Sequence, residues 1–188
     1  MRIISGKMKG TKLYIPTDKK IRPLKDLARE SIFNLLTHSG KILFKLEHSN
    51  ILDLYAGTGS FGLECLSRQA KNVFFVESEK DAVKILKKNI EKLKIKNKSK
   101  IFVSDVFQII KTQVLNDEKF DIIFCDPPFR ESKMDKLIET IIYKKILKQN
   151  GIIILHRGKS TKENFPSNFK IIEERFYGIS KIIFGKIL

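Results

Sequence analysis

The sequence predicts an α/β fold in which a mainly parallel sheet of seven strands has helices on both faces. From residue 51 onward, short runs of β-branched and aromatic residues alternate with segments whose apolar residues repeat at helical spacing. This alternation implies right-handed crossovers between parallel strands. A glycine turn at residues 57–59 follows the first of these strands and opens a helix. Open α/β sheets build pockets for nucleotide-like ligands in this way.

A chain of 188 residues fits one domain, with residues 1–40 as a basic hairpin and helix extension. No apolar run approaches the ~18 residues of a membrane span, and the first residues lack the apolar segment of a secretory signal. Cys65 and Cys125 have no metal-binding spacing and give no disulfide scaffold, so no metal is expected. Both thiols fit buried, reduced positions in a cytoplasmic protein.

The formal net charge of +16, from 37 basic and 21 acidic residues, favours a polyanionic partner. A surplus of this size creates a field that attracts nucleic acid. The alternative is compositional drift toward lysine, isoleucine and asparagine, which would leave the charge without a binding role. The charge alone does not separate these two interpretations.

Residues 1–25 are strongly basic and precede the alternating region. Two short strands are expected within residues 2–16, turning around Gly6 and Gly10. A basic hairpin in this place favours an arm that contacts RNA, and the other interpretation is a flap that covers a sheet edge. An aspartate-capped helix is expected over residues 26–38.

The remaining elements follow from the same two periodicities. Strands are expected at residues 51–55, 72–77, 100–104, 120–125, 151–155, 169–176 and 180–187. Helices are expected at residues 60–69, from 78 to about 93, over about ten residues after 105, and at 133–148. Ser78 and Asp81 form a capping-box pattern at the start of the second of these helices.

Four carboxylates lie at or near the carboxyl ends of predicted strands: Asp53, Glu77, Asp105 and Asp126. In a sheet of this class, ligands bind outside these ends, where the strand order reverses. Each acid alone could be a surface or capping residue. Acids are depleted in strands, however, so the coincidence of four favours a binding site at this edge.

The carboxylates and the glycine turn together favour an adenosine cofactor. Glu77 stands 20 residues after Gly57, a spacing at which a carboxylate accepts both hydroxyl protons of a ribose. Asp105 is placed to accept from the exocyclic amine of adenine. Asp53 would face a cationic part of a ligand, which a pyrophosphate lacks, so S-adenosylmethionine is favoured over NAD.

The Asp-Pro-Pro-Phe segment at residues 126–129 is the most specific motif. Its two prolines fix φ and hold the backbone rigid directly after a strand. The carboxylate of Asp126 and the backbone carbonyls can then accept both hydrogens of an amine on a planar ring, and Phe129 can stack on that ring. The alternative is a strand-terminating turn, which requires neither the acid nor the aromatic residue.

Together these motifs resemble those of class I S-adenosylmethionine-dependent methyltransferases that modify exocyclic amines. More narrowly, nearly the whole chain is similar to the bacterial small-subunit ribosomal RNA guanine-N2 methyltransferase family. The further matching segments are residues 2–10, 22–23, 29–34, 62–68 and 177–178. Two residues depart from the family pattern. Leu24 lacks the hydroxyl that usually follows Arg-Pro and contacts the cofactor. His156 replaces an acid at the end of the fifth strand, and we expect this departure to leave the chemistry unchanged.

The resemblance implies a Rossmann-like methyltransferase fold and direct methyl transfer to the N2 amine of a guanine in small-subunit ribosomal RNA. It assigns catalytic positions to Asp126, Pro127 and Phe129. It implies cofactor contacts by Asp53, Tyr55, Gly57, Thr58, Gly59, Glu77, Ser78, Asp105 and Val106. It implies RNA phosphate contacts, for which the candidates are Arg2, Lys7, Lys9, Arg22, Arg29 and Arg130. The expected substrate is free ribosomal RNA or an assembling small subunit, and the enzyme is expected to be a monomer.

Three other functions stay open on the residues alone. Asp-Pro-Pro-Phe also serves adenine amines, so one alternative is an adenine-N6 methyltransferase of RNA or DNA. The glycine turn also fits an NAD-dependent oxidoreductase, although only His156 of the three histidines lies near a strand end. The third alternative is a non-catalytic RNA-binding module that kept the fold.

Overall fold

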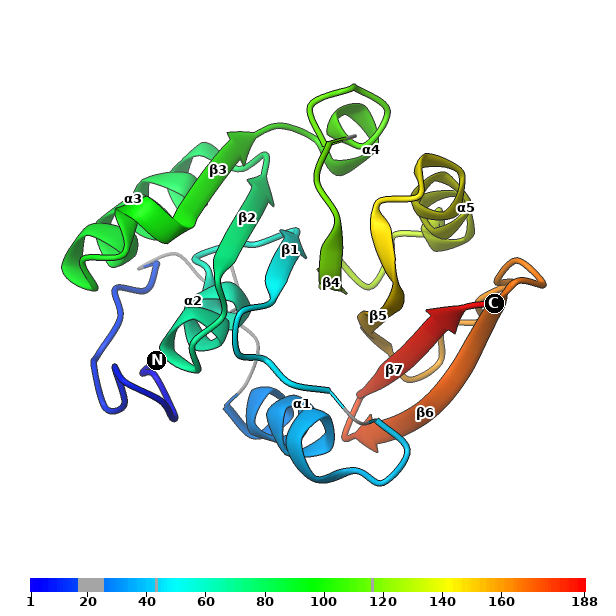
Figure 1. Ribbon diagram of the computed structural model, residues 1–188, viewed down its shortest axis with the longest axis horizontal. Coiled ribbons are helices and arrows are strands. Elements are labelled where there is room, and N and C mark those ends of the chain that lie inside the picture. The colour runs from blue at the N-terminus through cyan, green and yellow to red at the C-terminus, as the bar shows by residue number, and fades with distance from the viewer. Residues whose placement is uncertain (17–25, 43, 116) are drawn as a thin grey trace.

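The computed structural model describes residues 1–16, 26–42, 44–115 and 117–188. Its centre is a seven-stranded sheet in the order β3-β2-β1-β4-β5-β7-β6 (Figure 1). The strands are β1 Asn50–Leu54, β2 Asn72–Glu77, β3 Ser99–Val103, β4 Phe120–Cys125, β5 Leu147–Gly158, β6 Phe169–Tyr177 and β7 Ser180–Ile187. The strands β1 to β5 are parallel, and β7 runs antiparallel to both β5 and β6. The predicted α/β class and its mainly parallel sheet are confirmed.

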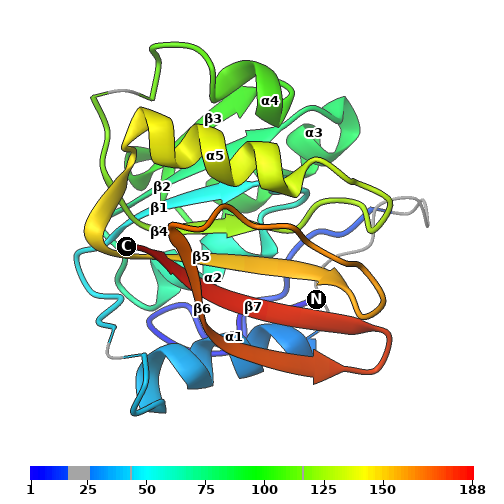
Figure 2. The same cartoon turned by 90° about the vertical axis from the view of Figure 1, so that its right-hand side faces the viewer.

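The helices cover both faces of this sheet (Figures 1 and 2). They are α1 Asp26–His38, α2 Ser60–Ser67, α3 Lys80–Lys92, the short 3-10 helix η1 Lys96–Lys98, α4 Val106–Ile109 and α5 Met134–Lys144. Helices α1, α2 and α3 share one core with the sheet, and α4 and α5 share the other. No helix in the described ranges is long and apolar enough to cross a membrane.

The strands at the centre of the sheet are apolar along almost their whole length because helices cover both of their faces. Along β4, Ile122 and Phe124 face the core under α1 to α3, and Ile123 and Cys125 face the core under α4 and α5. Both cysteines are free thiols and are buried, as expected. Burial raises the pKa of the Cys65 thiol well above its ordinary value, which keeps the group neutral.

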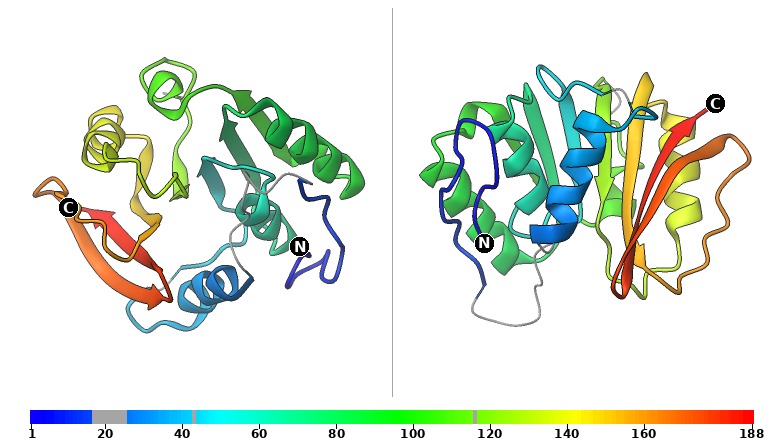
Figure 3. Two further views of the ribbon diagram at one scale, coloured as in Figure 1. Left: turned by 180° about the vertical axis from the view of Figure 1, so that it is seen from behind. Right: turned by 90° about the horizontal axis from the view of Figure 1, so that it is seen from below.

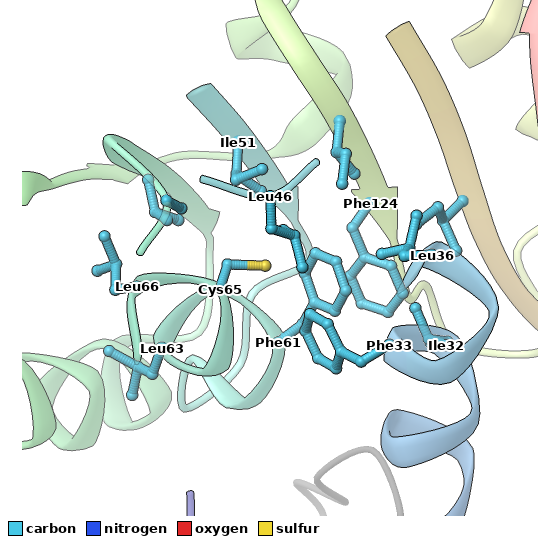
Figure 4. Close-up of a cluster of buried hydrophobic side chains, with 14 of the residues drawn as sticks. Ile32, Phe33, Leu36, Leu46, Ile51, Phe61, Leu63, Cys65, Leu66 and Phe124 are labelled. Carbon is cyan, nitrogen blue, oxygen red and sulfur yellow. The ribbon is translucent and has the colours of Figure 1, made fainter. Parts of the chain in front are cut away.

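Three phenylalanines from different elements form a stack in the core between the sheet and helices α1 and α2 (Figure 4). The ring of Phe61 in α2 lies 5.3 Å from Phe33 in α1 and 4.0 Å from Phe124 in β4, with both pairs nearly parallel. Each ring is almost fully buried. Aromatic pairs of this kind stabilise by about 0.5–1.5 kcal/mol beyond their area burial. The stack therefore fixes α1 and α2 against the strand that leads into Asp126.

The N-terminal arm, residues 1–16, folds back on itself as the sequence predicted, but its two halves pair over too short a length to form extended strands. An antiparallel bridge joins Arg2 to Lys12, and Ile3 donates its N–H to the Thr11 carbonyl at 3.0 Å. The backbone donors of Ile4 and Ser5 bind the Glu64 carboxylate of α2, at 2.7 and 2.9 Å. Figure 3 shows the arm lying along α2 and α3. A helix side chain thus satisfies backbone donors that the short pairing within the arm leaves free.

Three helices differ from the sequence expectation. The helix predicted at residues 133–148 ends at Lys144, where the left-handed backbone of Lys145 closes it, and β5 begins at Leu147 inside the predicted range. Helix α3 begins at Lys80, and its N-cap residue is Glu79 rather than Ser78, so the expected capping box does not form. Helix α4 has four residues rather than about ten. Near its end, the Thr112 hydroxyl donates to the carbonyl of Ile109 at 2.7 Å, which competes with helix continuation.

Candidate active site

The strand order reverses between β1 and β4, because the chain moves outward from β1 in one direction through β2 and β3 and in the other through β4 and β5. The parallel strands end at one edge, where Leu54 lies beside Val76 on one side and Cys125 on the other. Ligands of open α/β sheets bind at such a reversal point. The structure therefore brings all four predicted carboxylates to one edge of the sheet.

The turn after β1 has a backbone that requires glycine. Gly57 and Gly59 have φ values of +56° and +87°, and Tyr55 between strand and turn has a φ of +60°. A Cβ on Gly59 would lie 2.5 Å from Leu86 Cδ1, so α3 packs directly on this residue. A Cβ on Gly57 would meet nothing within 4 Å. Gly59 thus closes the turn against α3, and Gly57 presents its backbone to open space.

Glu77 holds the glycine turn from the neighbouring strand. Its Oε2 atom accepts from the Gly57 N–H at 2.7 Å, and its Oε1 atom accepts from the Glu79 N–H at 2.8 Å. Each carboxylate oxygen can accept more than one hydrogen bond. One half-buried carboxylate therefore orders two adjacent turns and keeps acceptor capacity for a ligand.

Asp53 is the most deeply buried of the four acids, with 1% of its surface exposed. Its Oδ2 atom accepts from the Gly62 N–H at 3.0 Å, which ties β1 to the first turn of α2. Burial raises the pKa of Asp53 to about 8, and the nearby carboxylates of Asp126 and Glu77 add to this rise. A cationic ligand that approached Asp53 would favour the ionised form of its carboxyl group. The ligand role of Asp53 remains a prediction, and its buried position at the glycine turn is consistent with it.

Two hydroxyls in the same turn are buried and lack a partner within the part of the chain that the structure describes. They are the Tyr55 Oη and Thr58 Oγ1 atoms. Burial is also the main reason that the pKa of Tyr55 lies above its ordinary value. An unsatisfied buried hydroxyl costs about 1–3 kcal/mol, and a polar ligand that supplies partners removes this cost. The turn therefore fits a small ligand with several polar groups.

Asp105 lies at the end of β3 and caps α4. Its Oδ1 atom accepts from the Gln108 N–H at 3.0 Å, and Val106 behind it is buried. The preceding residue, Ser104, donates its N–H to the carbonyl of Glu77 at 3.1 Å. Asp105 is exposed and lies beside the turn that Glu77 orders. This position suits a contact with one end of an extended ligand.

The Asp-Pro-Pro-Phe segment leaves β4 directly beside the glycine turn. The Asp126 N–H donates to the carbonyl of Leu54 at 3.4 Å. The carbonyl of Pro128 accepts from the Glu131 N–H at 2.8 Å and from the Arg157 guanidinium at 3.4 Å. Arg157 also donates to the carbonyl of Glu131. Buried Arg157 thus fixes a tight turn, and Phe129 stands 40% exposed at its tip.

His156, at the carboxyl end of β5, contacts this segment. Its Nδ1 atom lies 2.7 Å from Asp126 Oδ1, and its ring lies edge-on to Phe129 with 5.6 Å between centroids. The contact follows from the register, in which Cys125 pairs with Leu155 and the next residues lie level. The departure at His156, which we expected to leave the chemistry unchanged, therefore lies in contact with both Asp126 and Phe129.

The described residues contain no group of three side chains that could hold a metal ion. The chemistry available at this edge is hydrogen bonding, charge and aromatic stacking. A glycine turn with buried hydroxyls lies beside a rigid loop that presents a carboxylate and an aromatic ring. Such a pair of half-sites suits transfer of a group from a bound cofactor to a planar acceptor.

Comparisons with known proteins agree with this geometry. The family described as "Conserved hypothetical protein 95" matches residues 1–186. A ribosomal RNA small subunit methyltransferase D of Haemophilus influenzae is 33% identical over 95% of this chain and 90% of its own length. The chain belongs to this family. It is a methyltransferase, and the kinship and enzyme class predicted from the motifs are confirmed.

Solved structures place the methyltransferase in the expected Rossmann-like fold. The Escherichia coli protein yhhF has a TM-score of 0.85 and 26% identity, covering 100% of this chain and 97% of that one. The structure of SMU.776, described as a putative methyltransferase complexed with SAH, has a TM-score of 0.66 at 17% identity over 86% of this chain and 50% of that one. At that identity the likeness concerns the fold alone.

The predicted phosphate-binding residues of the methyltransferase do not all lie on its surface. Arg2, Lys7 and Lys9 are exposed on the arm, and Arg130 is exposed beside Phe129. The predicted contact of Arg22 lies outside the described residues, as does the departure at Leu24. Arg29 needs a correction, which its burial explains.

Arg29 is 0% exposed, so its predicted phosphate contact is wrong. Its guanidinium donates to the carbonyl of Arg2 at 2.6 Å, to the carbonyl of Ser60 at 3.3 Å and to Asp26 at 2.9 Å. Burial is the main reason that the pKa of Arg29 is lowered. The side chain joins α1 to the arm and to the start of α2. It organises the methyltransferase from inside.

Sequence reasoning missed three residues that order the site: Glu64, His156 and Arg157. Glu64 is fully buried and joins the arm to α2. One signal was available for it, since it is the single charge in a helix whose eight residues are all buried. His156 and Arg157 follow a run of apolar residues at the end of β5, the position where β4 carries Asp126. Their position at a strand end is the sequence signal for both residues.

Proposed function

We propose that this methyltransferase uses S-adenosylmethionine to methylate the exocyclic N2 amine of a guanine in small-subunit ribosomal RNA. The hydrogen bond from the Asp126 N–H to the Leu54 carbonyl carries the proposal most directly. It joins the amine-binding loop to the strand that leads into the glycine turn, so donor and acceptor sites are adjacent. The name of the Haemophilus influenzae relative supports ribosomal RNA of the small subunit as the substrate.

The cofactor supplies an electrophilic methyl group on a sulfonium centre. Gly57, Thr58 and Gly59 bind its methionine end, where the Thr58 hydroxyl lacks a protein partner among the described residues. Glu77 accepts from the ribose hydroxyls with the acceptor capacity that its two backbone contacts leave. Asp105 accepts from the adenine amine. The remaining cofactor residues that we propose are Asp53, Tyr55, Ser78 and Val106.

The acceptor half of the site positions a flipped base. Phe129 stacks on the base, as aromatic residues do with extruded nucleotides. Asp126 and the carbonyl of Pro127 accept the two hydrogens of the amine and draw its lone pair out of conjugation with the ring. With the cofactor bound, the new nitrogen–carbon bond would replace its carbon–sulfur bond, and the surplus amine proton would pass to the Asp126 carboxylate that accepts it or to water. The fixed acceptors stabilise positive charge that develops on nitrogen.

The RNA is positioned by phosphate contacts that read no sequence. Arg2, Lys7 and Lys9 on the arm, together with Arg130, are exposed and form the described part of this surface. Arg22 belongs to the same proposal. We propose that the enzyme acts as a monomer in the cytoplasm, on ribosomal RNA either free or in an assembling subunit.

The test is methyl transfer from labelled S-adenosylmethionine to small-subunit RNA from a strain that lacks the enzyme, followed by nucleoside analysis. Wild type is expected to label N2-methylguanosine. Asp126→Ala is expected to lower kcat by at least ~100-fold, the size of effect typical for a lost transition-state contact, while cofactor affinity persists. Asp81→Ala removes an exposed carboxylate from α3 and is the matched control. Label on adenine would show that the base assignment is wrong.

A further inference from the structure

We propose that His156 is a positioning residue that selects which oxygen of Asp126 meets the substrate amine. The inference rests on the proposed function and concerns the same site. His156 lies on β5, the neighbour of β4, and contacts both parts of the amine-binding segment. Three of its features point to this role: its hydrogen bond, its ring contact and its burial.

The hydrogen bond engages one particular carboxylate oxygen. His156 Nδ1 lies 2.7 Å from Asp126 Oδ1. An ionised carboxylate can only accept, so the imidazole carries a proton on Nδ1 and donates it. With one acceptor position of Oδ1 taken by the imidazole, Oδ2 keeps its full acceptor capacity and is the oxygen favoured for the amine. A carboxylate without this partner would rotate about its last bond and offer either oxygen.

The ring of His156 also limits Phe129. The two rings meet edge to face, at 5.6 Å between centroids and 72° between planes. Phe129 is otherwise 40% exposed, so this neighbour is important for the direction of its ring. A Cβ on Gly158, two residues after His156, would lie 3.4 Å from Phe129. The end of β5 therefore orients the stacking residue as well as the carboxylate.

The pair is sheltered, with 12% of the His156 side chain and 22% of the Asp126 side chain exposed. Water therefore competes less for the His156–Asp126 hydrogen bond, which is stronger than the same bond would be on the surface. The neighbouring Arg157 makes no contact with this pair that the structure records, because it donates to Glu163 and to the Pro128 and Glu131 carbonyls. Consecutive residues of β5 thus hold the two ends of one loop.

Two substitutions separate the hydrogen bond from the ring contact. His156→Phe keeps a ring beside Phe129 and removes the donor, and His156→Asn places an amide N–H near the position of Nδ1. We expect His156→Phe to lower kcat roughly 10- to 100-fold, since a small misplacement of a reacting group has effects of this order. His156→Asn is expected to recover most of this loss. The KM for RNA and the affinity for S-adenosylhomocysteine are expected to stay within about twofold of wild type.

The matched control is His38→Phe, which changes an exposed histidine at the end of α1 and is expected to leave kcat unchanged. Thermal unfolding of each variant verifies its fold. Wild-type kcat in His156→Phe would overturn the proposal. So would an equal loss in both His156 variants, because the hydrogen bond would then not be the cause.

A spectroscopic measurement tests the pair without methyl transfer. Two-bond proton–nitrogen spectra resolve the imidazoles of the three histidines. His156 is expected to carry its proton on Nδ1, and Asp126→Asn is expected to shift its signals. Signals that ignore Asp126→Asn would refute the contact. If wild type transfers no methyl group to ribosomal RNA, the proposed function fails, and these spectra still decide the positioning proposal.

Discussion

The Glu77 carboxylate accepts from the Gly57 N–H at 2.7 Å, so the second strand of the sheet holds the glycine turn of the first. The same carboxylate accepts from the Glu79 N–H. Its two oxygens therefore face two backbone donors at once. An amide in this position would turn its own NH₂ group toward one of these donors.

Glu77→Gln is expected to weaken S-adenosylmethionine binding by roughly 10- to 100-fold, because one backbone donor loses its acceptor and the ribose loses part of its own. Isothermal titration measures this affinity. Glu79→Gln is the matched control, since that side chain lies exposed in the same turn and caps nothing. Unchanged affinity in Glu77→Gln would contradict the assigned role.

Asp53 predicts a pH dependence of stability. Its folded pKa of about 8 lies above its ordinary value of 3.8. The folded state therefore binds a proton that the unfolded state has released, and the stability due to Asp53 falls as the pH rises from about 4 to about 8. The loss is at most about 1.4 kcal/mol per pH unit.

Asp53→Asn cannot titrate, and its side-chain oxygen can still accept from the Gly62 N–H. The variant is expected to gain stability relative to wild type as the pH rises from 5 to 8. Urea unfolding at several pH values measures this difference, and all other titrating groups cancel between the two proteins. Parallel curves for the two proteins would show that burial does not raise this pKa.

Arg29 is expected to act on stability and not on RNA binding. Arg29→Lys leaves a single ammonium that cannot reach the carbonyls of Arg2 and Ser60 and the Asp26 carboxylate together. We expect a loss of about 2–4 kcal/mol in the free energy of unfolding. Arg130→Lys, at an exposed position, is expected to change it by less than about 0.5 kcal/mol.

The arm lysines are expected to contribute to a salt-dependent RNA affinity. Lys7→Gln with Lys9→Gln removes two exposed charges, and the slope of log K against log salt is expected to become shallower by roughly 1.5 units. Filter binding at several salt concentrations measures this slope. A single change at an exposed position of α5, Lys136→Gln, is expected to leave it unchanged. An arm variant with the wild-type slope would favour compositional drift as the source of the charge.

Most of the helices and strands follow from patterns of apolar residues that are close together in the sequence. Strands β2 and β4 have the predicted bounds because runs of valine, isoleucine and phenylalanine are buried on both faces of a parallel sheet. Helix α4 does not, because a threonine hydroxyl competes with its backbone hydrogen bonds. The place of the arm against α2 depends on Glu64, 60 residues after Ile4, and no local pattern reveals that partner.

The sequence predicts which acidic residues lie at the site, but it does not predict which residues they contact. Strand ends identify Asp53, Glu77, Asp105 and Asp126 because parallel strands end at one edge. The direction of each side chain depends on register and packing, so the His156 contact with Asp126 was not predicted. Arg29 was assigned to the surface because its charge is visible in the sequence and its burial is not.

The contact between the arm and Glu64 has a consequence for the order in which the chain can fold. Ile4, Ser5 and Met8 donate their N–H groups to side chains 59 or 60 residues later, in α2. During synthesis the arm leaves the ribosome before these partners, which emerge only after β1 and the glycine turn. The arm therefore reaches its final place only after α2 has been made. Until then, this basic segment stays free beside the ribosome, a particle rich in the nucleic acid that its charge attracts.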